Sequence, residues 1–337
     1  MSNGKTFRCG VIGYGGAFNM GRLHLTSMSQ NEGVEIAAVC ELDSARREAA
    51  VEDFPGVKTF SRVGDLLRRG GLDLVTIITP HNTHAKLAVQ CLEAGVNVVC
   101  EKPMAITGAE VKSMMGAARR KKLMVTTFHN RRWDGDFVTL RGLIRDEGLI
   151  GRVFRVEAGG GGYGAQGNWW RADRKISGGS IYDWGAHFTD WILNIVPQPI
   201  DWVSGYQVKN EAWDHYTNED HSEYTLRFKD GCLAHLTQSN LSMVGRPRWR
   251  ILGETGAIED GGGKFLVKTL VNGRQMSTEV PFGESDWHAF YQNVFAHLRD
   301  GDDLTITPES AARVIGVLEA ANTSAGRGSA PVKPAFV

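Results

Sequence analysis

The feature that most constrains the fold is the regular alternation of short apolar runs and helix-like segments through the first 128 residues. Segments typical of helices, such as residues 83–93 and 107–122, separate the runs. Strands that are apolar throughout need cover on both faces, so this alternation predicts a parallel sheet with helices on each side. The predicted strands are residues 7–12, 35–40, 74–78, 97–100 and 124–128.

A different pattern begins after residue 129. A predicted helix at residues 136–147 is followed by segments in which apolar and polar residues alternate, at 152–158, 223–228 and 232–239. Turn signals such as Lys229-Asp230-Gly231 separate them, which is typical of antiparallel hairpins. The second half is therefore expected to be an α/β domain with an open, mostly antiparallel sheet. Its last two helices are predicted at 286–299 and 308–321.

Length, charge and cysteine usage limit the kinds of protein this can be. A chain of 337 residues is longer than one core usually grows, so we expect two domains, residues 1–129 and 130–337. Basic and acidic residues both total 38 without a basic tract, so no nucleic acid or membrane partner is expected. No export or membrane-spanning segment is present, which favours the cytoplasm. Buried reduced thiols are expected for Cys9, Cys40, Cys91, Cys100 and Cys232.

A glycine turn, Gly13-Tyr14-Gly15-Gly16, follows the first strand. In the dinucleotide fingerprint three glycines shape the turn, and an acid about 20 residues further binds the adenosine ribose. Gly13, Gly15 and Gly21 can fill these places, with Glu41 as the acid. Tight turns alone also explain such glycines, but the strand, helix and acid around them favour a Rossmann dinucleotide-binding domain. Because an acid repels a 2′-phosphate, NAD is favoured over NADP. Gly15 and Gly21 are six apart instead of three, so the turn around Ala17 is extended.

Polar residues end two later strands. Ligands gather beyond the carboxyl ends of parallel strands, so Lys102 in Glu101-Lys102-Pro103 is the first catalytic candidate. Thr79 and Pro80 are expected to line the dinucleotide cleft. His81 and His84 have no cysteine or carboxylate beside them, so His84 is expected near the cofactor and no metal is expected there.

A second constellation follows the glycine pair Gly178-Gly179. If this segment is a helix, Asp183 and His187 are four apart and share one face. A carboxylate that orients an imidazole suits general acid–base chemistry. A buried histidine bonded to a helical neighbour explains the spacing equally well, and the strand-end lysine elsewhere favours the catalytic interpretation.

Aromatic residues crowd the same part of the chain. Flat rings pack well against sugar rings, although tryptophan is more often core or interface, and a sugar or cyclitol substrate is therefore favoured. The four glycines at 159–162 form either a mobile loop over the cleft or a strand-edge turn where only glycine fits. His215, Asp220 and His221 are the other place for a metal, but a solvated loop is the favoured interpretation and no metal is expected. Candidate substrate contacts are Tyr163, Trp169, Trp170, Asp183 and His187, with Tyr182, Trp184 and Trp191 nearby.

These motifs together resemble the Gfo/Idh/MocA oxidoreductases, which include glucose–fructose oxidoreductase and inositol dehydrogenases. The resemblance covers nearly the whole chain and rests on the glycine turn, Thr79-Pro80 with His84, Glu101-Lys102-Pro103, and the segment from Gly178-Gly179 to His187. It implies a Rossmann domain followed by an α/β domain whose open sheet often mediates oligomerisation. A homo-oligomer formed through the C-terminal sheet is thus expected.

The resemblance also implies roles for individual residues. Lys102 matches the catalytic lysine, Asp183 the substrate-binding acid and His187 the acid–base histidine. The stretch from His129 to Asp134 looks like a subgroup that includes scyllo-inositol dehydrogenases. The extended glycine turn departs from the family pattern and leaves the diphosphate contacts open. The implied or expected cofactor contacts are Gly13, Gly15, Gly16, Ala17, Glu41, Thr79, Pro80, His84, Glu101, Lys102, Asn130 and Arg171.

Three functions follow as hypotheses. The first is an NAD-dependent dehydrogenase acting on a secondary alcohol of a sugar, cyclitol or anhydrosugar. The second is a redox-assisted glycosidase or lyase that oxidises a ring carbon transiently and recycles NAD. The third, a non-catalytic NAD-binding regulator, is disfavoured by the presence of Lys102, Asp183 and His187 together.

Overall fold

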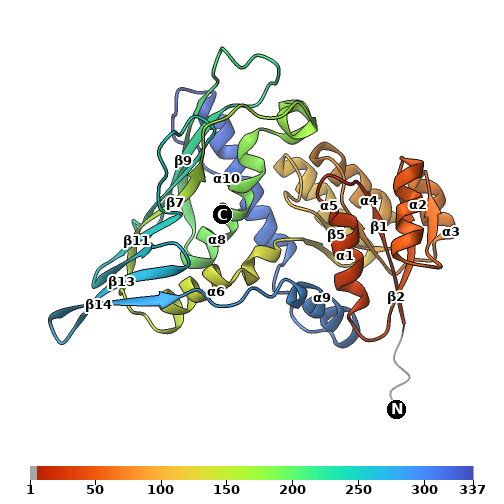
Figure 1. Cartoon of the computed structure of the whole chain (residues 1–337), viewed down its shortest axis with the longest axis horizontal. Helices are drawn as coiled ribbons and strands as arrows, with labels where there is room; N and C mark the ends of the chain where they lie inside the picture. Colours follow the sequence, from red (N-terminus) through yellow and green to blue (C-terminus); the bar gives the residue numbers. More distant parts are fainter. Residues whose placement is uncertain (1–5, 337) are drawn as a thin grey trace. The chain divides into compact units, whose positions relative to one another are not determined.

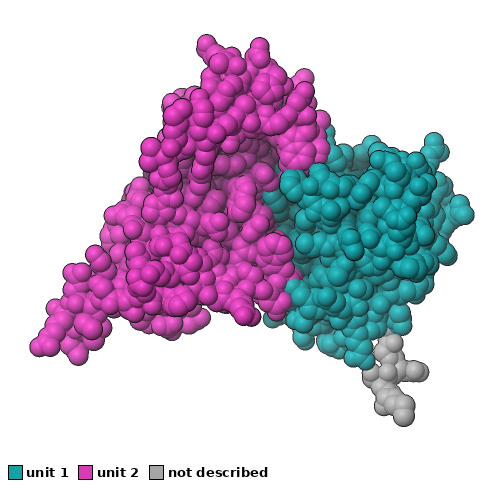
Figure 2. Space-filling view, in the orientation of Figure 1, with its two compact units in different colours: residues 1–105, 109–128, 288–311 teal, residues 106–108, 129–287, 312–337 magenta. Residues whose placement is uncertain are grey.

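The computed structural model describes residues 6–336, which form two compact units, coloured separately in Figure 2. Unit 1 runs to Ala105 and also takes in Ala109–Phe128 and His288–Ala311. Unit 2 consists of Ile106–Gly108, His129–Trp287 and the residues from Ala312 on. Each unit contains one sheet.

The sheet of unit 1 has six strands in the order β3-β2-β1-β4-β5-β6, and all its pairs are parallel, as the alternation predicts. The chain order reverses between β1 and β4, which is where ligands bind in open α/β sheets. The strands are β1 (Phe7–Ile12), β2 (Val34–Cys40), β3 (Lys58–Phe60), β4 (Leu74–Ile77), β5 (Asn97–Cys100) and β6 (Val125–Thr127). The connecting helices are α1 (Met20–Ser29), α2 (Ser44–Asp53), α3 (Val63–Arg69), α4 (His84–Glu93) and α5 (Gly108–Lys121).

Helix α9 (His288–Asp300) belongs to unit 1, although it follows the whole second sheet in the chain. The ring of Phe295 packs against Phe7 of β1 with 5.8 Å between centroids. Phe290 meets Phe128 edge-on at 4.8 Å. The compact units are therefore not two continuous stretches of chain. After the second sheet the chain returns to unit 1, and the strand–helix alternation of the sequence does not indicate this return.

The sheet of unit 2 has eight strands in the order β14-β13-β12-β11-β7-β10-β9-β8. Its pairs are antiparallel except β7 with β10, which confirms the mostly antiparallel sheet predicted for the second half. The strands are β7 (Val153–Gly161), β8 (Ile200–Val208), β9 (His221–Phe228), β10 (Leu233–Ser239), β11 (Trp249–Gly253), β12 (Gly256–Asp260), β13 (Lys264–Val271) and β14 (Arg274–Pro281).

Helices cover one face of this second sheet. Figure 1 shows α8 (Trp184–Ile195) and α10 (Pro308–Ala325) along it. Trp191 of α8 lies 5.6 Å from both Phe137 and Trp249, measured between ring centroids, and this aromatic cluster is part of the buried core of unit 2. On the strands, buried side chains alternate with more exposed ones such as Phe154 and Tyr206, so the opposite face is open, as expected.

Two predicted elements differ in detail. The helix expected at 136–147 splits into α6 (Gly135–Arg141) and a π-helical turn (Gly142–Asp146), in which the Glu147 N–H reaches back five residues to Gly142. The glycines at 159–161 belong to strand β7, and a Cβ on Gly159 would lie 2.0 Å from the Thr237 carbonyl oxygen. Close strand approach, and not a mobile loop, therefore explains Gly159.

The five cysteines are buried and free, as predicted. Burial raises the pKa of Cys40 to about 11 and that of Cys91 to about 12, which keeps both thiols protonated and unreactive near neutral pH. Among residues 6–336, no helix combines the length and apolar character needed to span a membrane.

Candidate active site

The glycine turn after β1 needs glycine at two positions and is open at a third. Gly13 has φ of 103°, and a Cβ there would lie 2.2 Å from the Ile78 carbonyl oxygen. A Cβ on Gly21 would meet the Tyr14 ring at 2.6 Å, so α1 can pack closely on the turn only with glycine there. A Cβ on Gly15 would meet nothing within 4 Å, so a ligand has access to its backbone. These are the three geometric roles of the dinucleotide fingerprint.

Glu41 lies directly after β2 with its carboxylate turned toward the glycine turn. One carboxylate oxygen accepts the Tyr14 N–H at 2.6 Å, and the other accepts the Asp43 N–H at 3.1 Å. Arg47 donates to the Glu41 carbonyl at 2.7 Å and fixes the backbone. The open backbone at Gly15 and this fixed carboxylate fit the diphosphate and the ribose of a dinucleotide.

His84 joins the ends of two neighbouring strands. Its Nδ1 lies 2.8 Å from the Pro103 carbonyl oxygen and its Nε2 lies 2.8 Å from the Thr79 carbonyl oxygen. Thr79 and Thr83 share a hydrogen bond of 2.6 Å between their hydroxyls. Both ring nitrogens of His84 are therefore directed at backbone carbonyls, which is not the arrangement of a metal ligand.

Lys102 follows β5. The glutamate before it contacts His24 of α1, which in turn contacts Tyr291 of α9. Glu101 accepts the Lys102 N–H at 2.9 Å and lies 3.1 Å from Nε2 of His24 on α1. His24 Nδ1 meets the Tyr291 hydroxyl of α9 at 2.8 Å, and that hydroxyl meets Thr76 of β4 at 2.8 Å. Burial alone would raise the pKa of Glu101, but His24 and Lys102 hold it below its usual range. The sequence gives no signal for His24 or Tyr291.

In unit 2 the segment that leads into α8 is fixed by a buried acid. Gly178 and Gly179 have φ of 89° and 122° and turn the chain. Glu219, 4% exposed, then accepts the Ser180 N–H at 2.9 Å, and its other oxygen accepts Arg174 at 2.6 Å. Tyr182 donates to the Ile106 carbonyl at 2.7 Å. Glu219 carries no motif of its own, so the sequence does not single it out.

Asp183 is the N-cap residue of α8 and not part of the helix, because a 3₁₀ turn (Ser180–Tyr182) intervenes after the glycines. Its carboxylate accepts Arg171 at 3.3 Å, and the Arg171 guanidinium lies over Trp170 at 4.6 Å and over Trp169 at 5.2 Å. Four of the predicted residues of unit 2 thus come together. Tyr163 instead packs against Trp213 at 5.6 Å.

His187 lies one turn into α8 and is 5% exposed. Its ring lies 5.7 Å from Trp184 and 6.3 Å, edge-on, from the buried ring of His129. Further along the helix, buried Asp190 accepts two hydrogen bonds from Arg132, at 2.8 and 2.6 Å. Burial raises the pKa of Asp190, but the charges of Arg132 and His129 outweigh it and hold the pKa below its usual range. The sequence gives no signal for this buried cluster.

Lys102 belongs to unit 1, whereas Asp183 and His187 belong to unit 2. Asn130 is buried in a 3₁₀ turn (Asn130–Trp133), and Ala17 is in the exposed part of the glycine turn. The roles of all these residues stay predictions.

The residues of the second possible metal group have separate partners. Asp220 is bound by the Tyr216 hydroxyl and by Lys209 at 2.9 Å. His215 Nε2 lies 3.2 Å from the Gln166 carbonyl oxygen, and His221 faces Glu223 at 3.6 Å. In the described part of the chain no three His, Cys, Asp or Glu side chains are grouped to hold a metal ion.

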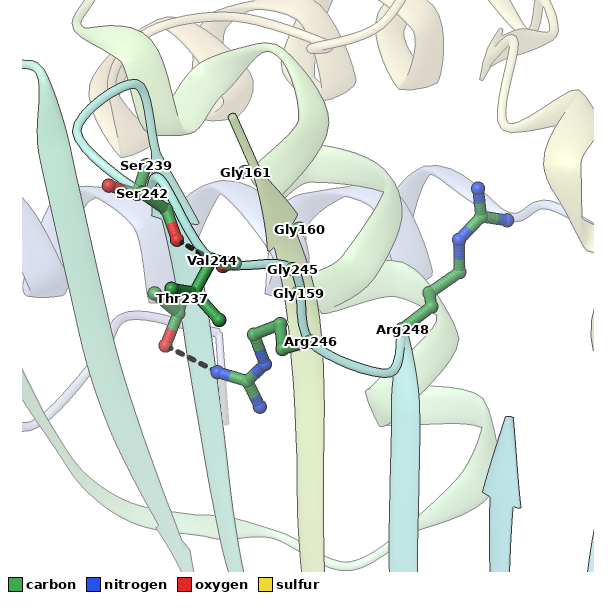
Figure 3. A pocket seen from close by; sticks show the side chains of 10 residues that line it. All are labelled: Gly159, Gly160, Gly161, Thr237, Ser239, Ser242, Val244, Gly245, Arg246 and Arg248. Atoms are coloured by element: carbon green, nitrogen blue, oxygen red, sulfur yellow. Dashed lines mark hydrogen bonds between the residues drawn. The ribbon is translucent and has the colours of Figure 1, made fainter. Parts of the chain in front are cut away.

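A pocket of about 210 Å³ lies where β7 and β10 end (Figure 3). Arg246 points toward Thr237 and donates to its hydroxyl at 2.9 Å, whereas Arg248 extends away and pairs with Asp136 at 2.9 Å. None of the predicted site residues lines this pocket. Its lining consists of Gly159, Gly160, Gly161, Thr237, Ser239, Ser242, Val244, Gly245, Arg246 and Arg248.

Two family models match consecutive parts of the chain. Residues 7–129 match the model described as "Oxidoreductase family, NAD-binding Rossmann fold". Residues 137–259 match the one described as "GFO/IDH/MocA C-terminal domain".

Known proteins are similar over most or part of the chain. The scyllo-inositol 2-dehydrogenase (NADP(+)) IolW of Bacillus subtilis is 25% identical over 95% of this chain and 94% of its own. The inositol 2-dehydrogenase of Salmonella typhimurium is 32% identical over 45% of each chain. The crystal structure of an NAD-binding protein from Listeria innocua superposes with a TM-score of 0.86 at 26% identity, covering 98% of this chain and 97% of that one.

Proposed function

Because the chain belongs to the Gfo/Idh/MocA oxidoreductase family and its residues 7–129 match an NAD-binding Rossmann fold, we propose that it is an NAD-dependent dehydrogenase of a sugar, cyclitol or anhydrosugar. The observation that carries this proposal is the fixed setting of its three reactive side chains. Lys102 follows a glutamate anchored by His24, while Asp183 precedes and His187 lies one turn into a helix that Glu219 holds at its entry.

In this proposal the three side chains act on the same substrate, and two of them act on the same secondary hydroxyl. His187 takes the hydroxyl proton as general base, and the Lys102 ammonium stabilises the negative charge that develops on the oxygen. Asp183 binds a neighbouring hydroxyl, with Arg171 fixing its carboxylate. A nicotinamide dinucleotide held at the glycine turn and Glu41 would supply the acceptor for the hydride of the carbinol carbon. Trp169 and Trp170 offer flat faces for a sugar or cyclitol ring.

The preference for NAD over NADP rests on Glu41. Its carboxylate lies beside the glycine turn, bound to two backbone N–H groups, and a 2′-phosphate at that place would be repelled. The relative IolW is named as NADP(+)-dependent, so both cofactors belong in the test.

We further propose that the open face of the second sheet joins two copies of the chain. Phe154, Tyr206 and Leu266 are exposed in β7, β8 and β13 and supply apolar area for such an interface. Light scattering coupled to size-exclusion chromatography measures the mass directly, and a monomer at micromolar concentration would contradict this part of the proposal.

The function is tested with a panel of sugars, inositols, anhydrosugars and glycosides, each offered with NAD or NADP. Net accumulation of NADH, followed by absorbance, supports the dehydrogenase. Substrate consumption without net NADH indicates the redox-assisted glycosidase or lyase instead, and cofactor binding without turnover indicates the regulator. In the Lys102→Ala and His187→Ala variants, kcat should fall about 10²- to 10⁴-fold while NAD still binds. Unchanged turnover in both would refute the assigned roles.

A further inference from the structure

Arg46 of helix α2 spans the extended glycine turn. Its Nε donates to the Tyr14 carbonyl at 2.9 Å, at the start of the turn. One terminal nitrogen, Nη2, donates to the Asn19 side chain at 3.3 Å, at the residue before α1. A Cβ on Gly16 would lie 3.1 Å from the other terminal nitrogen, Nη1. The guanidinium therefore lies against the turn and fastens both of its ends.

The fingerprint does not account for how this turn holds a diphosphate. In the common pattern the helix begins directly after the glycines, and its first N–H groups receive the phosphates. Here residues 15–19 are exposed, Asn19 has φ of 50°, and α1 begins only at Met20. The inserted residues lengthen the path between the open backbone at Gly15 and the helix N-terminus. The lengthened turn moves the backbone N–H donors of Gly15 and of the helix apart. A cationic side chain at the middle of the turn can supply donors between them.

Arg46 has donors left for this purpose. A guanidinium carries five N–H groups in a planar fork that matches a phosphate, and among the described residues no hydrogen bond uses Nη1 of Arg46. Arg46 also forms no ion pair within the part of the chain that the structure describes, and Asp53, which accepts the Tyr14 hydroxyl at 2.7 Å, faces Arg22 at 3.5 Å. The charge of Arg46 is therefore not neutralised at the turn.

We propose that Arg46 binds the diphosphate of the cofactor and thereby closes the extended glycine turn on it. The inference rests on the proposed function, because it takes the ligand to be a nicotinamide dinucleotide. The contacts of Arg46 are with Tyr14 and Asn19, whereas the carboxylate of Glu41 marks the ribose side. Arg46 accordingly serves NAD and NADP alike and does not select the 2′-phosphate.

Isothermal titration calorimetry with the full chain separates these assignments. The ligands are adenosine, ADP, 2′,5′-ADP and NAD, and the variants are Arg46→Gln and Arg46→Lys. In Arg46→Gln the Kd for ADP and NAD should rise about 10- to 100-fold, the loss typical of a charge-assisted hydrogen bond, while adenosine binding stays unchanged. Arg46→Lys, which keeps the charge but not the fork, should fall between wild type and Arg46→Gln.

Arg68→Gln is the matched control, because Arg68 is an exposed arginine of the same unit that pairs with Asp65 at 2.6 Å. It removes the same charge and should leave every Kd unchanged. The inference is overturned if Arg46→Gln weakens only 2′,5′-ADP, if it weakens adenosine as much as ADP, or if Arg68→Gln has an equal effect. Wild-type protein that binds ADP and NAD but oxidises no alcohol would contradict the proposed substrate class and leave the Arg46 result valid.

Discussion

The segments around Lys102 in unit 1 and around His187 in unit 2 are both anchored by residues distant in the chain, but by different chemistry. In unit 1, Glu101 contacts His24, His24 contacts the Tyr291 hydroxyl, and that hydroxyl contacts Thr76. The His24 ring also packs against Phe128. In unit 2, two buried acids each face an arginine. Hydrogen bonds of an uncharged hydroxyl, such as those of Tyr291, are individually modest, whereas a buried charge is costly once its partner is removed. Unit 2 should therefore respond more strongly to loss of a charge.

The largest expected effect is that of Asp190→Asn. Asp190 and Arg132 are 2% and 9% exposed, so the substitution removes the buried negative charge that accepts two hydrogen bonds from a buried guanidinium. Breaking such a pair destabilises a protein by about 3–5 kcal/mol. Urea unfolding followed by tryptophan fluorescence measures the loss.

The control for this prediction is Glu254→Gln in the same unit. Glu254 pairs with Arg152 at 2.7 Å, but both side chains are 52% exposed, so the free energy of unfolding should change by only about 0–1 kcal/mol. Equal effects of the two substitutions would remove the contrast drawn between buried and exposed pairs.

The next effect is expected for Glu219→Gln. The amide can still accept the Ser180 N–H, but it gives up the charge that faces Arg174. Hydrogen bonds to charged groups contribute about 1.5–3 kcal/mol, and a loss of this size is expected in urea unfolding. Because Glu219 holds the entry to α8, kcat should also fall about tenfold, as expected when reacting groups are slightly misplaced.

Glu223→Gln controls for loss of an acid near Glu219 in sequence, since Glu223 is a partly exposed residue of β9 that faces His235 at 3.0 Å. It should leave kcat unchanged. A Glu219→Gln variant with wild-type kcat would mean that the segment before α8 is held by the glycine pair and Tyr182 alone.

These anchors mark the limit of what the sequence predicts. The glycine turn, the strand ends and the parallel sheet follow from local patterns, because each depends on residues close together in the chain. Glu219 lies 39 residues from Ser180, and Tyr291 lies 267 from His24. Nothing in the spacing selects them among 38 acids or 7 tyrosines, because tertiary packing alone brings them into contact.

The placement of Asp183 shows the same limit on a shorter scale. A spacing of four predicts a shared helical face with His187, yet α8 begins only at Trp184. The positive φ angles of the glycine pair and the turn after it delay the helix, and the carboxylate meets Arg171 instead. Spacing places both residues near the start of one helix but does not give their geometry, since helix starts depend on backbone angles that the pattern does not specify.

A pH dependence also tests the buried ion pair of unit 2. The folded-state pKa of Asp190 lies below its unfolded value, because Arg132 and His129 outweigh the effect of burial. Its stabilisation is then complete above the unfolded pKa of about 4 and is lost as pH falls below it, by about 1.4 kcal/mol for each unit of depression. Wild type should lose more free energy of unfolding between pH 5 and pH 3 than Asp190→Asn does, as urea titrations at each pH would measure. Parallel curves would contradict this.

The smallest effect is expected in unit 1, for Tyr291→Phe. The substitution keeps the ring against Phe290 and Phe128 but removes the hydroxyl shared by His24 and Thr76. A net hydrogen bond contributes about 1 kcal/mol, so unfolding should shift by about that amount, well below the loss for Asp190→Asn. A loss of 3 kcal/mol or more would mean that the network around Glu101 depends on charge as much as that around Asp190. The contrast between the two units would then not hold.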